Sequence, residues 1–139
     1  MSTLNGAISA SASALDAQRA RMEVAVSNLA NAESTRGADG QPYRRREVVL
    51  EAQNGQSMSG HIEAAGVKVA GVIEDQSPFR RRYEPSHPDA DKDGFVQVPN
   101  VDVPEEMVDM LGAARAYQAN LTAIGLIRDT IQRALELAK

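Results

Sequence analysis

The string Asp89-Ala90-Asp91-Lys92-Asp93-Gly94 is the part of this sequence whose residue types and spacing come closest to a metal site. Carboxylates at positions 1, 3 and 5 and a glycine at position 6 match the opening of an EF-hand calcium loop. Such a loop ends with a bidentate glutamate at position 12 and leads into a helix. This sequence has Asn100 at that position, and residues 95–98 alternate in the manner of a strand. We therefore predict an aspartate-rich turn between strands and no metal ligand, with calcium binding through Asp89, Asp91 and Asp93 as the alternative.

Two arginine clusters, residues 44–46 and 80–82, could bind phosphate groups, acidic lipid or an acidic partner. Both fall in segments that we expect to be strands, where successive side chains point to opposite faces of the sheet. Three consecutive arginines therefore do not form one basic patch. We expect them to lie on solvated strand edges or to form ion pairs between subunits.

The remaining residue types exclude most kinds of catalysis. The chain has no cysteine, which excludes disulfides, thiolate chemistry and cysteine-ligated zinc. His61 and His87 are its only histidines, and they lack the spacing of a metal-ligand pair. No nucleophile elbow or glycine-rich phosphate loop is present, and a net charge of −4 is unlike that of a nucleic-acid-binding protein. We predict no catalytic residue, no cofactor, no small-molecule substrate and no nucleic-acid partner.

The elements that must position any functional residue are two long helices at the ends of the chain. Apolar residues repeat there every seven positions, which predicts helices that pack against other helices. We expect the first helix to span about residues 3–31, and the second to begin near Asp102, a good N-cap, and to continue almost to residue 139. The helix seams, which form the candidate assembly interface, consist of Leu4, Ile8, Leu15, Met22, Leu29, Met107, Met110, Tyr117, Leu121, Ile124, Ile131 and Leu135.

The first helix has a weak apolar stripe, because residues 7–14 contain only alanine, serine and one isoleucine. Alanine buries little area and serine favours helix only weakly, so we expect this segment to become ordered on binding. In the second helix Gly112 and Gly125 interrupt the pattern. We interpret them as points of close approach between helices, with tolerated weakness as the alternative.

The segment between the helices has the pattern of a small β-rich domain. We expect strands at residues 44–51, 67–73, 79–83 and 95–98, and loops at residues 54–60 and 86–93. The sequence therefore predicts an α+β fold, in which the terminal helices pack as an antiparallel, coiled-coil-like pair with the β-rich domain inserted between them. Its three parts are residues 1–31, 32–100 and 101–139. The sequence has neither an apolar run long enough for a membrane span nor the pattern of a cleavable secretory signal.

Several strings in the chain resemble one known family. Two of them are Ser27-Asn28-Leu29-Ala30-Asn31-Ala32, which closes the first helix, and Arg115-Ala116-Tyr117-Gln118-Ala119-Asn120, which lies in the second. Others are Asn100-Val101-Asp102-Val103-Pro104-Glu105-Glu106-Met107-Val108, Gly40-Gln41-Pro42-Tyr43-Arg44, Gly66-Val67-Lys68-Val69 and His87-Pro88-Asp89-Ala90-Asp91. Together they resemble the bacterial flagellar rod and hook axial proteins over nearly the whole chain, and especially the short proteins of the proximal rod. The residues that carry the family motifs are Asn28, Leu29, Ala30, Asn31, Tyr117, Gln118, Ala119 and Asn120.

The resemblance implies a non-enzymatic structural subunit of the flagellar basal-body rod, which spans the periplasm. Such a subunit polymerises through its terminal helices into a helical tube that transmits torque and houses the export channel. The flagellar type III apparatus exports it without a cleavable signal peptide. The implied partners are copies of the chain, other rod proteins and, we expect, ring and rod-base adaptor proteins of the basal body.

Two alternatives stay open from the residues alone. One is a soluble coiled-coil adaptor that presents the β-rich domain to a partner, and the other is the calcium-binding module described above.

The roles of three motif residues are open as well. Asn28 and Asn31 could cap the first helix, or hold its end to the β-rich domain or to a neighbour. Tyr117 could be a core residue or a seam residue whose hydroxyl reaches a partner.

Overall fold

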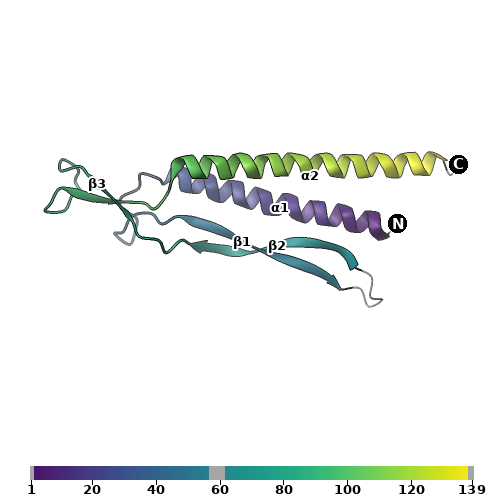
Figure 1. The fold of residues 1–139 in the computed structure, drawn as a ribbon, viewed down its shortest axis with the longest axis horizontal. Helices are drawn as coiled ribbons and strands as arrows, with labels where there is room; N and C mark the ends of the chain where they lie inside the picture. Colours follow the sequence, from purple (N-terminus) through teal and green to yellow (C-terminus); the bar gives the residue numbers. More distant parts are fainter. Residues whose placement is uncertain (1, 57–61, 138–139) are drawn as a thin grey trace. The chain divides into compact units, whose positions relative to one another are not determined.

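A computed structural model describes residues 2–56 and 62–137 of the chain. The elements are α1 (Ser2–Ala30), β1 (Arg46–Gln56), β2 (Ile62–Glu74), β3 (Arg80–Tyr83), β4 (Phe95–Val98) and α2 (Val103–Leu137) (Figure 1). The fold is α+β, as the sequence predicted. Along the chain, a small antiparallel β region lies between the N-terminal and the C-terminal helix. Both helix boundaries lie within two residues of the predicted ones. None of the described helices is both long and apolar enough to cross a membrane.

The chain divides into two compact units, each of which contains parts of α1, β1, β2 and α2. The first unit comprises Met1–Ala20, Val49–Gly71 and Leu111–Lys139, and the second comprises Arg21–Val48 and Val72–Met110. The predicted division into residues 1–31, 32–100 and 101–139 follows the order of the elements and stays a prediction.

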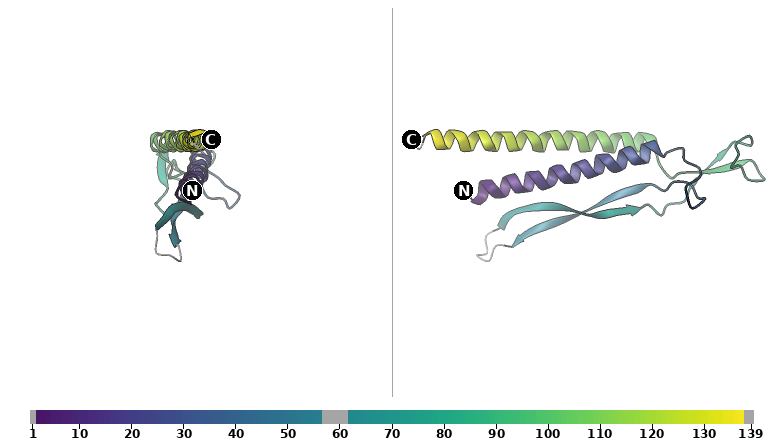
Figure 2. Two further views of the ribbon diagram at one scale, coloured as in Figure 1. Left: turned by 90° about the vertical axis from the view of Figure 1, so that its right-hand side faces the viewer. Right: turned by 180° about the vertical axis from the view of Figure 1, so that it is seen from behind.

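In the first unit α1 lies between α2, which runs antiparallel to it, and the hairpin of β1 and β2 (Figure 2). Small side chains make this packing close: Ala17 and Ala113 are almost completely buried. The hairpin also approaches α1 at Gly66, where an added Cβ would lie 2.9 Å from Ser13 Oγ. The Val67 N–H, one residue further on, donates to the same oxygen (3.0 Å). A side chain at position 66 would therefore force Ser13 out of its present position.

The second unit has a small core around the β3–β4 sheet and the start of α2. The two strands pair antiparallel, with Arg80 opposite Val98 and Tyr83 opposite Phe95. Because side chains alternate along a strand, β4 buries its second and fourth residues and exposes the third. Buried side chains of this core include Ala25, Asn28, Ala32, Val96, Val98, Pro99, Val101 and Glu106.

The helix ends of the second unit follow from local hydrogen bonds. The Glu105 N–H donates to Asp102 Oδ1 (3.2 Å), so Asp102 is the N-cap that the sequence predicted. At the end of α1 the Ser27 carbonyl accepts from both the backbone N–H (3.2 Å) and the side-chain amide (2.9 Å) of Asn31.

The β-strands differ from the prediction in length. Within residues 2–56 and 62–137 they form two separate two-stranded sheets, β1 with β2 and β3 with β4. The predicted loop at residues 54–60 was wrong for residues 54–56, which continue β1, and its remainder lies outside the described residues. Asn54 and Gly55 disfavour strands intrinsically, but pairing across the hairpin outweighs this preference. Strand β2 begins at Ile62, earlier than predicted, and β1 begins at Arg46, later than predicted.

The two glycines of α2 do not mark close approaches within the chain. A Cβ added at Gly112 or Gly125 would meet no atom within 4 Å. The interpretation as a close approach between helices is therefore wrong within the described part of one chain. The expectation that residues 7–14 become ordered on binding is not tested by a structure of one chain and stays a prediction.

Candidate assembly interface and polar junction

The predicted seam residues fall into two groups by exposure. Ile8, Leu15, Met22, Leu29, Met110, Tyr117, Ile124 and Ile131 are half-buried in the chain. Met107, Leu121 and Leu135 are exposed, with 49%, 47% and 56% of their surface accessible. The side chain of Leu4 lies outside the described residues. The half-buried group thus contributes mainly to packing within the chain, and its role between subunits stays a prediction.

A second apolar stripe on α2 was missed by the seam prediction. Val108, Leu111, Leu126 and Leu137 are all more than half exposed. At 3.6 residues per turn they fall within an arc of about 80° on α2, on the side away from Ala113. Among the described residues, eight of the thirteen exposed large hydrophobic side chains lie on α2: Val103, Met107, Val108, Leu111, Leu121, Leu126, Leu135 and Leu137. Helix α2 therefore offers the principal apolar surface to a partner.

A polar junction in the second unit joins the end of α1 to the start of β1 and the start of α2. Its central residue is Asn28, which is 1% exposed. The Asn28 amide donates to the Arg46 carbonyl (2.9 Å) and to Glu106 Oε2 (3.0 Å). Its oxygen accepts from the Arg46 N–H (3.0 Å) and the Tyr43 hydroxyl (3.0 Å). All four hydrogen-bonding positions of this buried amide are therefore filled.

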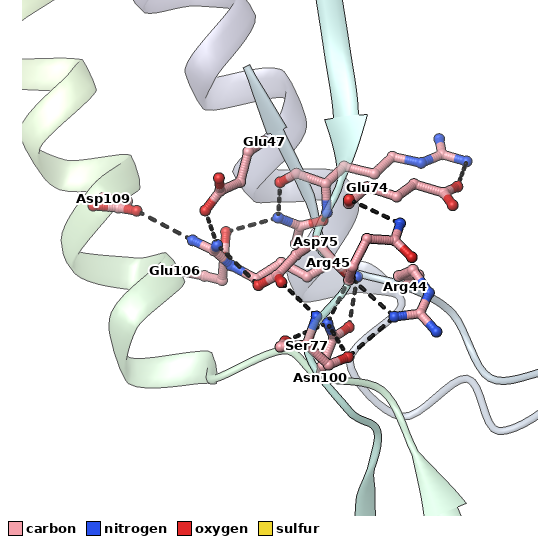
Figure 3. A network of polar contacts seen from close by, with 12 residues as sticks. Arg44, Arg45, Glu47, Glu74, Asp75, Ser77, Asn100, Glu106 and Asp109 are labelled. Carbon is pink, nitrogen blue, oxygen red and sulfur yellow. Dashed lines mark hydrogen bonds and ion pairs between the residues drawn. The ribbon is translucent and has the colours of Figure 1, made fainter. Parts of the chain in front are cut away.

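Glu106 and Arg45 form a buried ion pair next to this amide. Glu106 is 2% exposed, and its Oε1 accepts from Arg45 Nε. Arg45 also pairs with Glu47 and lies near Asp75 (3.8 Å) and Asp109 (3.7 Å) (Figure 3). Burial alone would lower the pKa of Arg45, but the hydrogen bonds to Glu106 and Glu47 outweigh it and raise that pKa above the ordinary value. A buried carboxylate on α2 is thus compensated by Asn28 of α1 and by Arg45, the residue before β1.

Asn100 provides a second amide bridge in the same unit. Its oxygen accepts from the Arg45 N–H (2.8 Å), and its amide donates to the Asp75 carbonyl (3.1 Å) and to Ser77 Oγ (2.8 Å) (Figure 3). The backbone N–H of Ser77 donates to the Asp75 carboxylate, and this bond lowers the pKa of Asp75. Arg44 donates to the carbonyls of Asp75 and Ser77 (3.0 Å each). The segment that follows β2 is therefore held to the start of β1 and to the chain before α2.

The motif residues turn out to have different roles. Asn28 holds the helix end to the β region within one chain, whereas the Asn31 amide donates to the Ser27 carbonyl in the last turn of α1. Asn120 donates to the Ala116 carbonyl of its own helix (2.8 Å), and Tyr117 is half-buried. Leu29 is half-buried, whereas Ala30, Gln118 and Ala119 are exposed. A role of this set between subunits stays a prediction.

Sequence reasoning missed Tyr43 and Glu106 as partners of Asn28, and Arg45 as the partner of Glu106. In the sequence Glu106 is an acidic residue in the first turn of a helix, where its charge would interact favourably with the helix dipole. The available signal was its position inside the string Asn100–Val108, which resembles the family. Burial of this carboxylate depends on Asn28, 78 residues earlier in the chain, and no local pattern reports such a contact.

The arginine clusters are used within the chain. In the second cluster Arg80 donates to the Val101 carbonyl, Arg81 pairs with Asp91 and Arg82 pairs with Glu33. Arg44 and Arg81 also lie over the rings of Phe79 (4.3 Å) and Phe95 (4.5 Å). Contacts within the chain account for these residues, and the expectation of ion pairs between subunits stays a prediction.

The aspartate-rich string forms a turn between β3 and β4. Asp91 Oδ1 accepts from the N–H groups of Phe95 and Asp93, and Oδ2 pairs with Arg81. These contacts, the Phe95 bond first, lower the pKa of Asp91. Asp89 binds the Thr35 hydroxyl and the Arg36 guanidinium. Within residues 2–56 and 62–137 there is no group of three or more histidine, aspartate or glutamate side chains that could hold a metal ion.

Comparisons with known proteins relate both ends of the chain to one family. Residues 8–38 match the family model described as flagella basal body rod protein. Residues 92–137 match the model described as flagellar basal body rod FlgEFG protein C-terminal. The two matches contain the end of α1 and all of α2, which carry the junction and the exposed stripe.

Individual relatives match over almost their whole length. The flagellar basal-body rod protein FlgC of Salmonella typhimurium is 47% identical over 129 residues, covering 91% of this chain and 92% of the relative. The protein of the same name from Bacillus subtilis is 44% identical, with 95% and 96% covered. That of Aquifex aeolicus is 38% identical, with both chains covered completely. None of these relatives is named as a coiled-coil adaptor or a calcium-binding protein.

Proposed function

Because this chain belongs to the FlgC family of flagellar basal-body rod proteins, we propose that it joins neighbouring rod subunits through the exposed stripe of α2. The protein is a structural subunit of the bacterial flagellar basal-body rod, and it assembles there with other rod proteins. Its relatives are named as flagellar basal-body rod proteins. We propose that this chain, too, has no enzymatic activity.

The observation that supports the interface is the stripe of Val108, Leu111, Leu126 and Leu137. Each side chain leaves more than half of its surface in water, although burying such a side chain fully would stabilise a contact by about 1.5–3 kcal/mol. A partner that covers the stripe would recover much of this energy. When the covering surface on the next copy differs from the stripe, the contact is heterologous, and it repeats as a helical array when the rotation between copies does not close a ring.

Further features belong to the proposal through family membership. The terminal helices form the inner layer of a helical tube that transmits torque and houses the export channel. The flagellar type III apparatus exports the subunit without a cleavable signal peptide. Copies of the chain and other rod proteins cover the stripe, and ring or rod-base adaptor proteins of the basal body contact other faces.

The experiment compares aspartate substitutions at one apolar and one polar exposed position of α2. We expect Leu126→Asp, at a residue with 62% of its surface accessible, to abolish swimming and incorporation into purified basal bodies. The exposed polar residue Gln132 provides the matched control, and Gln132→Asp should swim normally. Export of the variant, measured by its amount outside the cytoplasm, should persist, because the substitution changes only an exposed residue.

Leu121→Asp tests the predicted seam in the same assays. We expect it to abolish motility and rod assembly while export persists. Normal swimming by Leu126→Asp would contradict the role of the stripe, and normal swimming by Leu121→Asp would contradict the seam. Circular dichroism of each purified variant should show unchanged helix content, so that loss of assembly is not a consequence of unfolding.

A further inference from the structure

The β1–β2 hairpin has an open edge along each of its two strands. It is a two-stranded sheet of 11 and 13 residues, so both of its strands are edge strands. An edge strand has backbone N–H and C=O groups without a partner strand, and these groups can pair with a strand of another chain. In a protein that is concentrated in an assembly, as proposed above, long open edges favour aggregation.

Two side chains of α1 bind such backbone groups. In the first unit Ser13 Oγ accepts from the Val67 N–H of β2 (3.0 Å) and donates to the Ala10 carbonyl (2.8 Å), so the hydroxyl is fixed in its acceptor role. Gly66 allows this contact, because a Cβ there would lie 2.9 Å from the same oxygen.

In the second unit Asn28 binds both backbone groups of one residue. The Arg46 N–H donates to Asn28 Oδ1 (3.0 Å), and the Arg46 carbonyl accepts from Asn28 Nδ2 (2.9 Å). The neighbouring residue, Arg45, directs its carbonyl to the Asp75 N–H on the β2 side (2.8 Å). Since backbone groups alternate along a strand, those of Arg46 point away from β2. The Asn28 amide therefore takes the place of one residue of a neighbouring strand.

We propose that Ser13 and Asn28 are edge-capping residues, which keep the hairpin of one copy from pairing with the hairpin of another. Glu106 and Tyr43 position the second cap. Glu106 can only accept and lies 3.0 Å from Asn28 Nδ2, and the Tyr43 hydroxyl donates to Oδ1. Turning the amide over would bring its oxygen against Glu106 and against the Arg46 carbonyl. The orientation that matches the strand edge is therefore the favoured one.

Hydrogen exchange of the full-length protein tests the caps residue by residue. Ser13→Ala removes the acceptor while favouring helix in α1, so we expect the Val67 amide to exchange roughly tenfold faster with little change elsewhere, as the loss of one hydrogen bond implies. Ser9→Ala, at an exposed serine of the same helix, is the control and should leave Val67 unchanged. Unchanged exchange at Val67 in Ser13→Ala would overturn the proposal for β2.

Two variants at Asn28 test the second cap. One removes both the oxygen that accepts from Arg46 and the amide that donates to it, and the other keeps an accepting oxygen. Asn28→Ala should expose the Arg46 amide, whereas the double variant Asn28→Asp/Glu106→Gln keeps an acceptor and should keep that amide protected. Equal exchange of Arg46 in both variants would overturn the proposal for β1. If Asn28→Ala loses protection throughout the second unit, that unit has unfolded. The exchange of Arg46 in the double variant and of Val67 in Ser13→Ala then tests the two caps.

Association of the isolated protein tests the consequence of capping. The double variant Ser13→Ala/Asn28→Ala should form oligomers with an intermolecular β-sheet infrared signature and dye binding, at concentrations where the unaltered protein and Ser9→Ala do not. A variant that remains free of such oligomers despite exposed Val67 and Arg46 amides would overturn the proposal. This outcome does not depend on the rod, because Leu126→Asp should change rod assembly without producing β-paired oligomers.

Discussion

Removal of the Glu106 carboxylate should destabilise the protein far more than removal of its neighbour in the sequence. Glu106 is 2% exposed and accepts hydrogen bonds from Asn28 and Arg45. Breaking a buried ion pair by removing one partner costs about 3–5 kcal/mol. Arg45 retains Glu47 as a partner, so we expect Glu106→Ala to lower the free energy of unfolding by about 2–4 kcal/mol. That is a large share of a typical stability of about 5–15 kcal/mol.

The matched control is Glu105→Ala. Glu105 lies in the same first turn of α2 but is exposed. Its loss removes mainly a favourable interaction with the helix dipole, worth about 0.3–1 kcal/mol. Urea unfolding of both variants, followed by circular dichroism, measures the difference. The slope of the transition should stay the same, which shows that the native and unfolded states expose the same surface as before.

A double-mutant cycle with Asn28→Ala attributes the cost to the junction. Because Asn28 and Glu106 share a hydrogen bond, the double variant should be more stable than the sum of the single effects predicts, by about 0.5–3 kcal/mol. The reasoning fails if Glu106→Ala costs no more than Glu105→Ala. It also fails if the two single effects add within about 0.5 kcal/mol, because then the residues do not act on each other.

Three further perturbations test separate contacts. Tyr43→Phe removes the hydroxyl that donates to Asn28 and should cost about 1 kcal/mol in urea unfolding; no loss would mean that this bond contributes nothing. Gly66→Ala places a Cβ 2.9 Å from Ser13 Oγ and should lower the melting temperature, whereas Gly71→Ala, where a Cβ meets nothing within 4 Å, should not lower it comparably. The pKa of Asp91 is lowered in the folded state by the Phe95 N–H, so its contribution to stability is present above the unfolded pKa of about 3.9 and is lost as the pH falls through the lower folded value. Thermal melts between neutral and strongly acidic pH should therefore show a smaller acid-induced loss for Asp91→Asn, and identical pH curves would contradict the role of that carboxylate.

The fold of this protein was predictable where local rules decide it. The seven-residue apolar repeat gave both helices, and the N-cap preference of aspartate placed the start of α2 at Asp102. Alternation placed β4 at residues 95–98. The length of the hairpin was not predictable, because Asn54 and Gly55 are poor strand formers whose conformation is set by pairing with the opposite strand.

The candidate interface was predicted only in part. Periodicity identifies a helix that has an apolar face, and it found Leu121 and Leu135, which are exposed. It did not find Val108, Leu111 and Leu137, because Arg115, Gln118 and Thr130 stand seven positions away from them and break any seven-residue apolar repeat. Which stripe packs within the chain depends on where α1 lies, and this is a property of the tertiary structure.

The sequence by itself determined the elements and the family, since helix and strand periodicities and the motif strings are local properties of the chain. Only the tertiary structure decided what the motif residues do. Asn28 has the sequence signature of a helix cap, but it is the centre of a junction that includes Glu106, 78 residues away. Burial of a polar group is tolerable only when its partners are in place. Those partners come from segments that folding alone brings together.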